Sequence, residues 1–150
     1  METAREGVAP AATGGFDGGE HWLVELRSVP AQRLAGAEGR AALEALFARA
    51  VARFGLRPLG ALTLHTFDGL DGTPGAGGST AFLALTESHL AAHGFPEAGV
   101  LCLDLFTCRP RGCAADADRV WRELTEAVLG ACDIEVRRIE RGGERKGRIR

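Results

Sequence analysis

The feature of this sequence that most limits its fold is a set of four short apolar runs placed between two longer segments of helical periodicity. In the helical segments apolar residues recur at intervals of three and four, as in Leu43, Leu46 and Phe47. A further apolar run precedes the first helix, and another follows the second. The predicted strands are 22–26, 59–67, 80–85, 89–93, 100–106 and 134–136, and the predicted helices are 38–54 and 114–129.

This order, β-α-β-β-β-β-α-β, predicts an α+β protein, a two-layer α/β sandwich. Consecutive strands favour a mainly antiparallel sheet, and the two amphipathic helices bury their apolar sides on one face of it. Gly55 is expected to end the first helix, and glycines with a proline mark 68–78 as a loop. Residues 1–19 are expected to be disordered, 20–140 to form a single domain, and 141–150 to form a basic tail.

Composition argues against several classes of protein. The net charge of −2 gives no electrostatic basis for binding nucleic acid or an anionic membrane. No apolar run reaches the roughly 18 residues that a membrane-spanning helix requires, and the first residues lack the apolar core of a signal peptide. Because no CxxC pair occurs and nothing suggests export, we expect a cytoplasmic protein whose four cysteines are reduced thiols, and we expect no metal site.

Residues 86–108 hold a dense set of chemically active side chains. Ser88 follows Glu87, His93 lies five residues further on, and Cys108 closes the next apolar run. A hydroxyl, an imidazole and a thiol can serve as nucleophile, general base and general acid. The only lysine, Lys146, falls in the charged tail, so no buried Schiff-base lysine for pyridoxal phosphate is available.

Three strings in this region resemble the motifs of prokaryotic-type S-adenosylmethionine decarboxylase, a pyruvoyl-dependent carboxy-lyase. The family pattern reads E-S-H-L, H-T-W-P-E and D-x-F-T-C, and this chain has E-S-H-L at 87–90, H-G-F-P-E at 93–97 and D-L-F-T-C at 104–108. A weaker similarity extends from about residue 21 to residue 142. The resemblance implies a two-layer α/β sandwich that works as a homodimer of self-cleaved protomers.

The resemblance also implies that the cofactor is made from the chain itself. The Ser88 hydroxyl would attack the carbonyl carbon of Glu87, and β-elimination of the resulting ester would release the upstream chain. Hydrolysis would then leave a pyruvoyl group at position 88, whose ketone forms a Schiff base with the substrate amine and acts as an electron sink for decarboxylation. His93 matches the proton acceptor of this processing reaction, and an imidazole suits that role at neutral pH.

Other matched positions concern catalysis and the substrate. Cys108 matches the proton donor of the decarboxylation, and a thiol is mostly protonated at neutral pH. Glu97 matches a residue that holds ribose hydroxyls, and Phe67 matches one that stacks on adenine. Thr80 stands where the family has a processing serine, although the adjacent Ser79 could serve instead. The implied substrate is S-adenosylmethionine, and the implied pathway leads through aminopropyl transfer to spermidine.

Three alternatives stay open at the level of sequence. Departures from the family at 68–79, 94–95 and 109–110 could border the substrate pocket, so the substrate could be a basic amino acid such as ornithine or arginine. His89, His93, Cys102 and Cys108 could bind zinc, but four residues of extended chain span about 13 Å, too far for one ion to bridge. The chain could also be an uncleaved, non-catalytic homologue.

Overall fold

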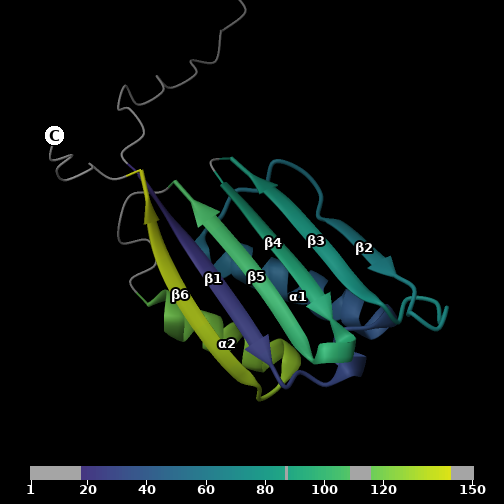
Figure 1. Ribbon diagram of the computed structural model, residues 1–150. Helices are drawn as coiled ribbons and strands as arrows, with labels where there is room; N and C mark the ends of the chain where they lie inside the picture. Colours follow the sequence, from purple (N-terminus) through teal and green to yellow (C-terminus); the bar gives the residue numbers. More distant parts are fainter. Residues whose placement is uncertain (1–17, 87, 109–115, 143–150) are drawn as a thin grey trace, which may run out of the picture.

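The computed structural model describes residues 18–86, 88–108 and 116–142 of the chain. These residues form a six-stranded sheet in the order β2-β3-β4-β5-β1-β6, with two α-helices on one side of it (Figure 1). The strands are β1 (Gly19–Arg27), β2 (Thr63–Phe67), β3 (Gly78–Leu85), β4 (Ser88–Phe95), β5 (Val100–Thr107) and β6 (Asp133–Arg141), and the helices are α1 (Gly36–Phe54) and α2 (Ala117–Leu129), with short 3-10 turns at Ala31–Arg33 and Pro96–Ala98.

The predicted fold class is confirmed. Every pairing between neighbouring strands is antiparallel, and the observed order of strands and α-helices is the predicted one. Helix α1 contacts β2 and β3, α2 contacts β6, and the two helices contact each other. Both helices lie behind the sheet in the view of Figure 1, so no helix of the described residues lies on the opposite face of the sheet.

Alternation along the strands divides the sheet into a buried face and an open face. In β5, Leu101, Leu103 and Leu105 are almost completely buried against the helices, while the residues between them are half-buried. Phe47 of α1 and Trp121 of α2 fill the layer between helices and sheet. Each large apolar side chain buried in this way contributes roughly 1.5–3 kcal/mol to folding. The core therefore fixes which side of every strand faces away from the helices.

Helix α1 ends where the sequence predicts. Gly55 has a φ of 59°, a left-handed conformation that glycine adopts without the steric cost of a side chain. Its N–H donates to the carbonyl of Ala52, and the N–H of Leu56 donates to the carbonyl of Val51. These two hydrogen bonds satisfy carbonyl groups that the end of a helix otherwise leaves without partners.

Strand β2 is shorter than predicted. It begins at Thr63 and not at residue 59, because the chain after α1 first makes an irregular connection. Pro58 forms only an isolated bridge with Leu85, and the N–H of Leu59 donates to the carbonyl of Ala84 at 2.9 Å. Proline and glycine in 58–60 interrupt the regular pairing that the apolar pattern alone suggests.

Strand β6 is longer than predicted, covering 133–141 in place of 134–136. The second half of β6 is charged but still joins the sheet. Arg138 forms an ion pair with the buried carboxylate of Glu20. The Arg138 guanidinium also lies 5.7 Å from the ring centroid of Trp22. Strand β1 likewise begins at Gly19, inside the 1–19 segment expected to be disordered, and β6 includes Arg141 of the expected basic tail. The remainder of both terminal segments, 1–17 and 143–150, lies outside the described residues.

None of the helices in the described part of the chain is long and apolar enough to cross a bilayer.

Candidate active site

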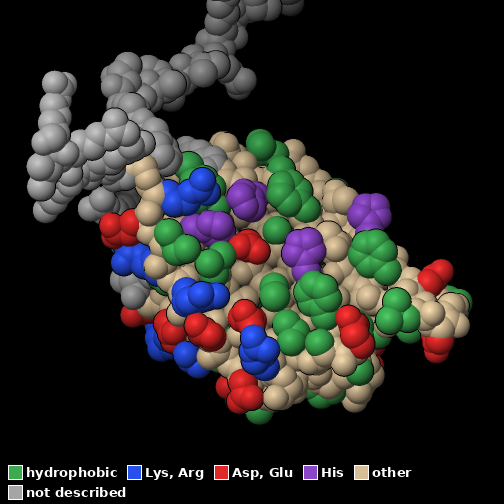
Figure 2. Space-filling model, viewed as in Figure 1, with side chains coloured by type: hydrophobic (Ala, Val, Ile, Leu, Met, Phe, Trp, Pro, Cys, Tyr) green, Lys and Arg blue, Asp and Glu red, His purple; other side chains and the backbone are tan. Residues whose placement is uncertain are grey.

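The histidines gather on the open face of the sheet. His21, His65, His89 and His93 each alternate with residues that face the helices, such as Leu64 beside His65 and Leu90 beside His89. Figure 2 views this face, where histidines, apolar side chains and a few charged side chains lie together over the strands. The residue types that acid–base chemistry requires are therefore on the side of the sheet that the helices leave uncovered.

Ser88 and Cys108 lie at the same end of the sheet. Ser88 is the first residue of β4 and pairs with Thr107, the last residue of β5, while Cys108 follows directly. Paired residues on antiparallel strands have Cα atoms about 5 Å apart, so Cys108 lies one residue beyond the direct cross-strand partner of Ser88. We call this group the Ser88 end. Glu87, the other residue at the expected cleavage point, lies outside the described residues.

Thr80 and His93 form a second group. They pair across β3 and β4, and Thr80 Oγ1 lies 3.1 Å from His93 Nδ1. If Nδ1 carries the hydrogen and donates to Thr80, then His93 Nε2 has the lone pair that a general base needs. Ser79, the alternative hydroxyl, is buried towards the helices, and its Oγ has no hydrogen-bond partner among the described residues. Thr80 is thus the hydroxyl that contacts His93.

The two expected substrate-binding residues lie near this second group. Phe67 ends β2 opposite Gly78 and is about half exposed. Glu97 is exposed in the 3-10 turn that follows β4, and Pro96 of that turn packs close to Gly78. We call the group of Phe67, Thr80, His93 and Glu97 the His93 end.

The two ends are far apart within one chain. Ser88 and His93 occupy the same strand, and five residues of strand span about 16 Å. Ser88 pairs with Thr107 near one end of β5, whereas His93 pairs with Cys102 near the other. A histidine must lie within hydrogen-bonding distance of the proton that it removes. A single copy of the chain therefore does not place His93 beside its own Ser88.

Between the two ends lies a cluster of aromatic and charged groups, which we call the aromatic cluster: His21, Phe82, His89, Asp104 and Phe106. The ring of His89 stacks on Phe82 with centroids 5.9 Å apart and lies at the same distance from Phe106. His21 Nε2 is 3.1 Å from a carboxylate oxygen of Asp104. Burial lowers the pKa of His89 below the usual 6.5, and the nearby His21 and Arg141 lower this pKa further while Asp104 opposes them.

The strand geometry also bears on the zinc hypothesis. His89 and His93 are four residues apart in β4, about 13 Å in extended chain, and Cys102 and Cys108 are separated by a still longer stretch that begins in β5. His93 and Cys102 do pair, but two ligands do not make a zinc site. Within the described ranges, no group of three or more His, Cys, Asp or Glu side chains is arranged to hold a metal ion.

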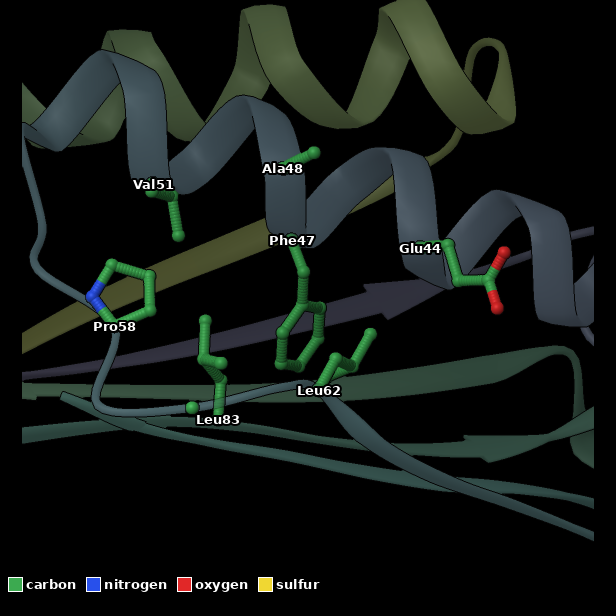
Figure 3. A pocket seen from close by; sticks show the side chains of 8 residues that line it. Glu44, Phe47, Ala48, Val51, Pro58, Leu62 and Leu83 are labelled. Atoms are coloured by element: carbon green, nitrogen blue, oxygen red, sulfur yellow. The ribbon is translucent and has the colours of Figure 1, made fainter.

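An apolar cavity of about 390 Å³ lies on the other side of the sheet (Figure 3). Phe47 and Val51 of α1 and Leu83 of β3 line it, and Pro58 and Leu62 come from the connection between α1 and β2. Glu44 is the only ionisable residue in this lining. Because the sheet separates the cavity from the histidines, we place the candidate active site on the open face.

A family model described as S-adenosylmethionine decarboxylase matches residues 20–142, which is most of the chain. The chain belongs to the S-adenosylmethionine decarboxylase family. The family that the three motifs predict is thereby confirmed.

Relatives in this family carry the name S-adenosylmethionine decarboxylase proenzyme. The protein from Parasynechococcus marenigrum is 30% identical over 109 residues, which cover 73% of this chain and 77% of the relative. The protein from Picrophilus torridus is 36% identical over 73 residues, or 49% of this chain and 53% of the relative. The protein from Moorella thermoacetica is 42% identical over 65 residues, or 43% and 49%. In these last two matches the chain spans about half the length of the relative.

A solved structure agrees with the architecture. The crystal structure of the adenosylmethionine decarboxylase from Aquifex aeolicus superposes with a TM-score of 0.61 at 24% identity, covering 89% of this chain and 98% of that one. The likeness at this identity concerns the fold, and the two-layer arrangement of helices and sheet is common to both.

The sequence did not single out His21, Phe82 or Phe106 of the aromatic cluster. Strand alternation places each of them on the open face once the strands are known. Their proximity to His89, however, depends on the register between β3, β4, β5 and β1. A period of two predicts the face of a residue but not its neighbours across the sheet.

Proposed function

We propose that this chain is a self-cleaving, pyruvoyl-dependent S-adenosylmethionine decarboxylase that works as a homodimer. One observation carries the proposal: in a member of this family, Ser88 begins β4 directly beside Thr107 and Cys108. Leu85 and Ser88 are themselves paired, so only Thr86 and Glu87 connect β3 to β4. The expected cleavage point therefore falls at the tip of a tight hairpin at one end of the sheet.

Processing would proceed in three balanced steps. The Ser88 hydroxyl adds to the Glu87 carbonyl carbon and the amide C–N bond breaks, leaving an ester and an amine. A base removes the Cα proton of residue 88, and the bond between its Cβ and the ester oxygen breaks, which releases Glu87 as a carboxylate and leaves dehydroalanine. Water then replaces the nitrogen of the resulting dehydroalanine, which releases ammonia and leaves a pyruvoyl group. No oxidant or metal enters this balance.

The proposed base is His93 of a second copy of the chain. Within one copy, Ser88 is about 16 Å from His93 along β4. A twofold dimer in which the open faces of the two sheets meet can place the His93 end of one copy over the Ser88 end of the other. Thr80 would orient the imidazole by accepting the hydrogen of Nδ1, since their atoms lie 3.1 Å apart. Two equivalent sites follow from one twofold axis.

Side chains on the open face support this dimer. Among the large apolar side chains that are exposed, Phe67, Phe82, Phe95 and Ile139 occupy strand positions of that face, and each is between 42% and 51% exposed. Several half-exposed apolar side chains on one face of a sheet favour an interface there. A second copy would bury these side chains and exclude water from the histidines.

In the decarboxylation itself the pyruvoyl group supplies a carbonyl that withdraws electrons from the substrate carbon as CO2 leaves. The residues of this chain would bind and protonate. Cys108, next to the Ser88–Thr107 pair, would donate a proton to the substrate carbon. Phe67 and Glu97 at the His93 end would hold the adenine and the ribose, since an exposed ring can stack on a base and a carboxylate can accept from two hydroxyls.

Intact-mass measurement of the purified protein tests the proposal. We expect two fragments, 1–87 and 88–150, the second blocked to Edman sequencing, and a single intact chain from Ser88→Ala. The cleaved protein should release CO2 from carboxyl-labelled S-adenosylmethionine and not from labelled ornithine or arginine. A wild-type chain that stays intact would refute self-cleavage. Release from ornithine or arginine alone would leave the pyruvoyl chemistry in place and overturn the substrate.

A further inference from the structure

His89 occupies an unusual position relative to the proposed cleavage. It is the residue directly after Ser88, so its backbone nitrogen carries the pyruvoyl group once the chain is cut. Cleavage turns the middle of a hairpin into two chain ends, and chain ends fray unless contacts hold them. The reacting ketone would then be at the tip of a strand whose covalent support has been removed.

The upstream end has an anchor of its own. The N–H of Thr86 donates to the carbonyl of Arg57 at 2.9 Å, and its hydroxyl donates to the same carbonyl at 3.1 Å. These two hydrogen bonds tie the upstream end to the segment after α1, on the β2–β3 side of the sheet. They do nothing for residue 88, which is on the other side of the cut.

The rings around His89 come from both sides of the cut. Phe82, in the upstream fragment, stacks on the imidazole with an interplanar angle of 23°. Phe106, in the downstream fragment, is the direct cross-strand partner of His89 and lies 5.9 Å from it. His21, again upstream, approaches the imidazole edge-on at 6.3 Å and is itself held 3.1 Å from Asp104. These centroid distances fall within the range of favourable aromatic pairs.

We propose that His89 is a positioning residue for the pyruvoyl end: its ring, held between Phe82 and Phe106, fixes the new chain end after the backbone is cut. This inference rests on the proposed cleavage between Glu87 and Ser88. The part of His89 that acts is its flat ring, because the contacts on both sides are ring contacts. Holding residue 88 still keeps the ketone at a constant distance from Cys108.

A fixed pyruvoyl end makes the proton transfer that follows decarboxylation more accurate. The proton should go to the substrate carbon that has lost CO2. If the pyruvoyl end moves, the proton can go to the carbon of residue 88, and hydrolysis with one water then leaves alanine on the chain and releases the substrate as an aldehyde. An alanine end, unlike a pyruvoyl end, is open to Edman sequencing. The ratio of alanine ends formed to CO2 released therefore reports how well the end is held.

The experiment compares His89→Ala and His89→Phe with wild type and with His65→Ala, a control histidine on the open face of edge strand β2. We expect His89→Ala to be cleaved but to form about tenfold more alanine ends per CO2 released, the effect of losing two aromatic pairs. His89→Phe keeps the ring and should behave like wild type, as should His65→Ala. Phe82→Leu removes one of the two aromatic pairs without altering the residue next to the cut, and should raise the ratio by about threefold.

Several results would overturn the inference. An unchanged ratio of alanine ends to CO2 in His89→Ala would show that the ring of His89 does not hold the pyruvoyl end. A ratio in His89→Phe as high as in His89→Ala would show the same. If His89→Ala fails to fold or to cleave, Phe82→Leu decides alone, and an unchanged ratio there refutes the inference. Loss of the wild-type oligomeric state in both variants would assign the rings to the interface between copies. An intact wild-type chain would instead refute the proposed function, so the two failures are distinguishable.

Discussion

The proposed role of Cys108 as proton donor, next to the Ser88–Thr107 pair, can be tested by single substitutions. Cys108→Ala should still be cleaved, because the elimination depends on a histidine, but its decarboxylation should fall by about a hundredfold or more, as is typical when a general acid is removed. Cys132, a half-buried thiol in the connection between α2 and β6, gives the matched control Cys132→Ala. Cleavage is followed by intact mass and turnover by CO2 release. Full activity in Cys108→Ala would contradict the assignment.

Glu97 separates nucleoside recognition from the chemistry. The carboxylate is exposed at the His93 end, so Glu97→Gln should leave cleavage unchanged. Losing a charged hydrogen bond to the ribose should lower kcat/KM for S-adenosylmethionine by about ten- to a hundredfold. Steady-state kinetics of the cleaved variant measure this loss. A kcat/KM equal to that of wild type would mean that the carboxylate does not touch the substrate.

The lowered pKa of His89 predicts that acid destabilises the fold. Burial keeps the native imidazole neutral to a lower pH than in the unfolded chain, whose histidines have a pKa of 6.5. Between the two pKa values the unfolded chain binds more protons, so the free energy of unfolding falls as pH drops through 6.5 and levels off below the native pKa. Urea unfolding of the one-chain Ser88→Ala protein at about pH 7.5 and about pH 5 checks this. Adding His89→Phe should reduce the difference, and an undiminished difference would assign it to other groups.

At the scale of elements, close approach between β3 and the end of β4 depends on Gly78. This residue has a φ of 102°, and a Cβ there would lie 2.2 Å from the carbonyl oxygen of Gly94. Gly72 also has a positive φ, of 80°, but a Cβ there meets nothing within 4 Å. Gly72→Ala should therefore cost only backbone strain, about 1 kcal/mol, and Gly78→Ala about 1–3 kcal/mol more. Denaturant unfolding of each variant in the Ser88→Ala chain measures the loss in free energy of unfolding. Equal losses would show that the chain relieves the contact with the Gly94 carbonyl at no cost.

The elements themselves show what a linear pattern can predict. Helix α1 and strands β3 to β5 follow apolar periodicity closely, because most residues on their buried sides are apolar. Strand β6 escapes that pattern, since Arg138 satisfies its charge with Glu20, a residue more than a hundred positions away. Neither partner is apolar, and no local rule links them. An ion pair between an exposed arginine on an edge strand and a buried carboxylate on its neighbour is a tertiary contact that a sequence window cannot contain.

At the scale of the whole molecule, the motifs identified the residues of the candidate site but not its assembly. In the sequence, Ser88 and His93 suggest one catalytic group. In the structure they are five residues apart in the extended strand β4, which separates them by about 16 Å. Strand register then places Thr80 with His93 and Cys108 with Ser88. In the proposed homodimer, a second sheet that faces the first would bring the two half-sites together.

A dimer that shares its sites makes a prediction about mixed chains. Ser88→Ala lacks the attacking oxygen, and His93→Ala lacks the base, so each variant alone should remain intact. In a mixed dimer, the His93 of the Ser88→Ala chain faces the Ser88 of the His93→Ala chain, and that one site is complete. Co-expression with random pairing makes about half of the dimers mixed. We therefore expect about half of the His93→Ala chains to be cleaved and all Ser88→Ala chains to stay intact.

Different tags on the two variants allow mixed dimers to be purified and each chain to be weighed separately. Size-exclusion chromatography with light scattering confirms that both variants keep the oligomeric state of wild type, which matters because a change in assembly would also abolish cleavage. Cleavage of His93→Ala on its own would show that His93 is not the base. Purified mixed dimers in which the His93→Ala chain stays intact would show that the base is not shared between copies. In that case Ser88 and His93 of the same chain, about 16 Å apart along β4, would have to approach by more than the length of the His93 side chain before Ser88 could react.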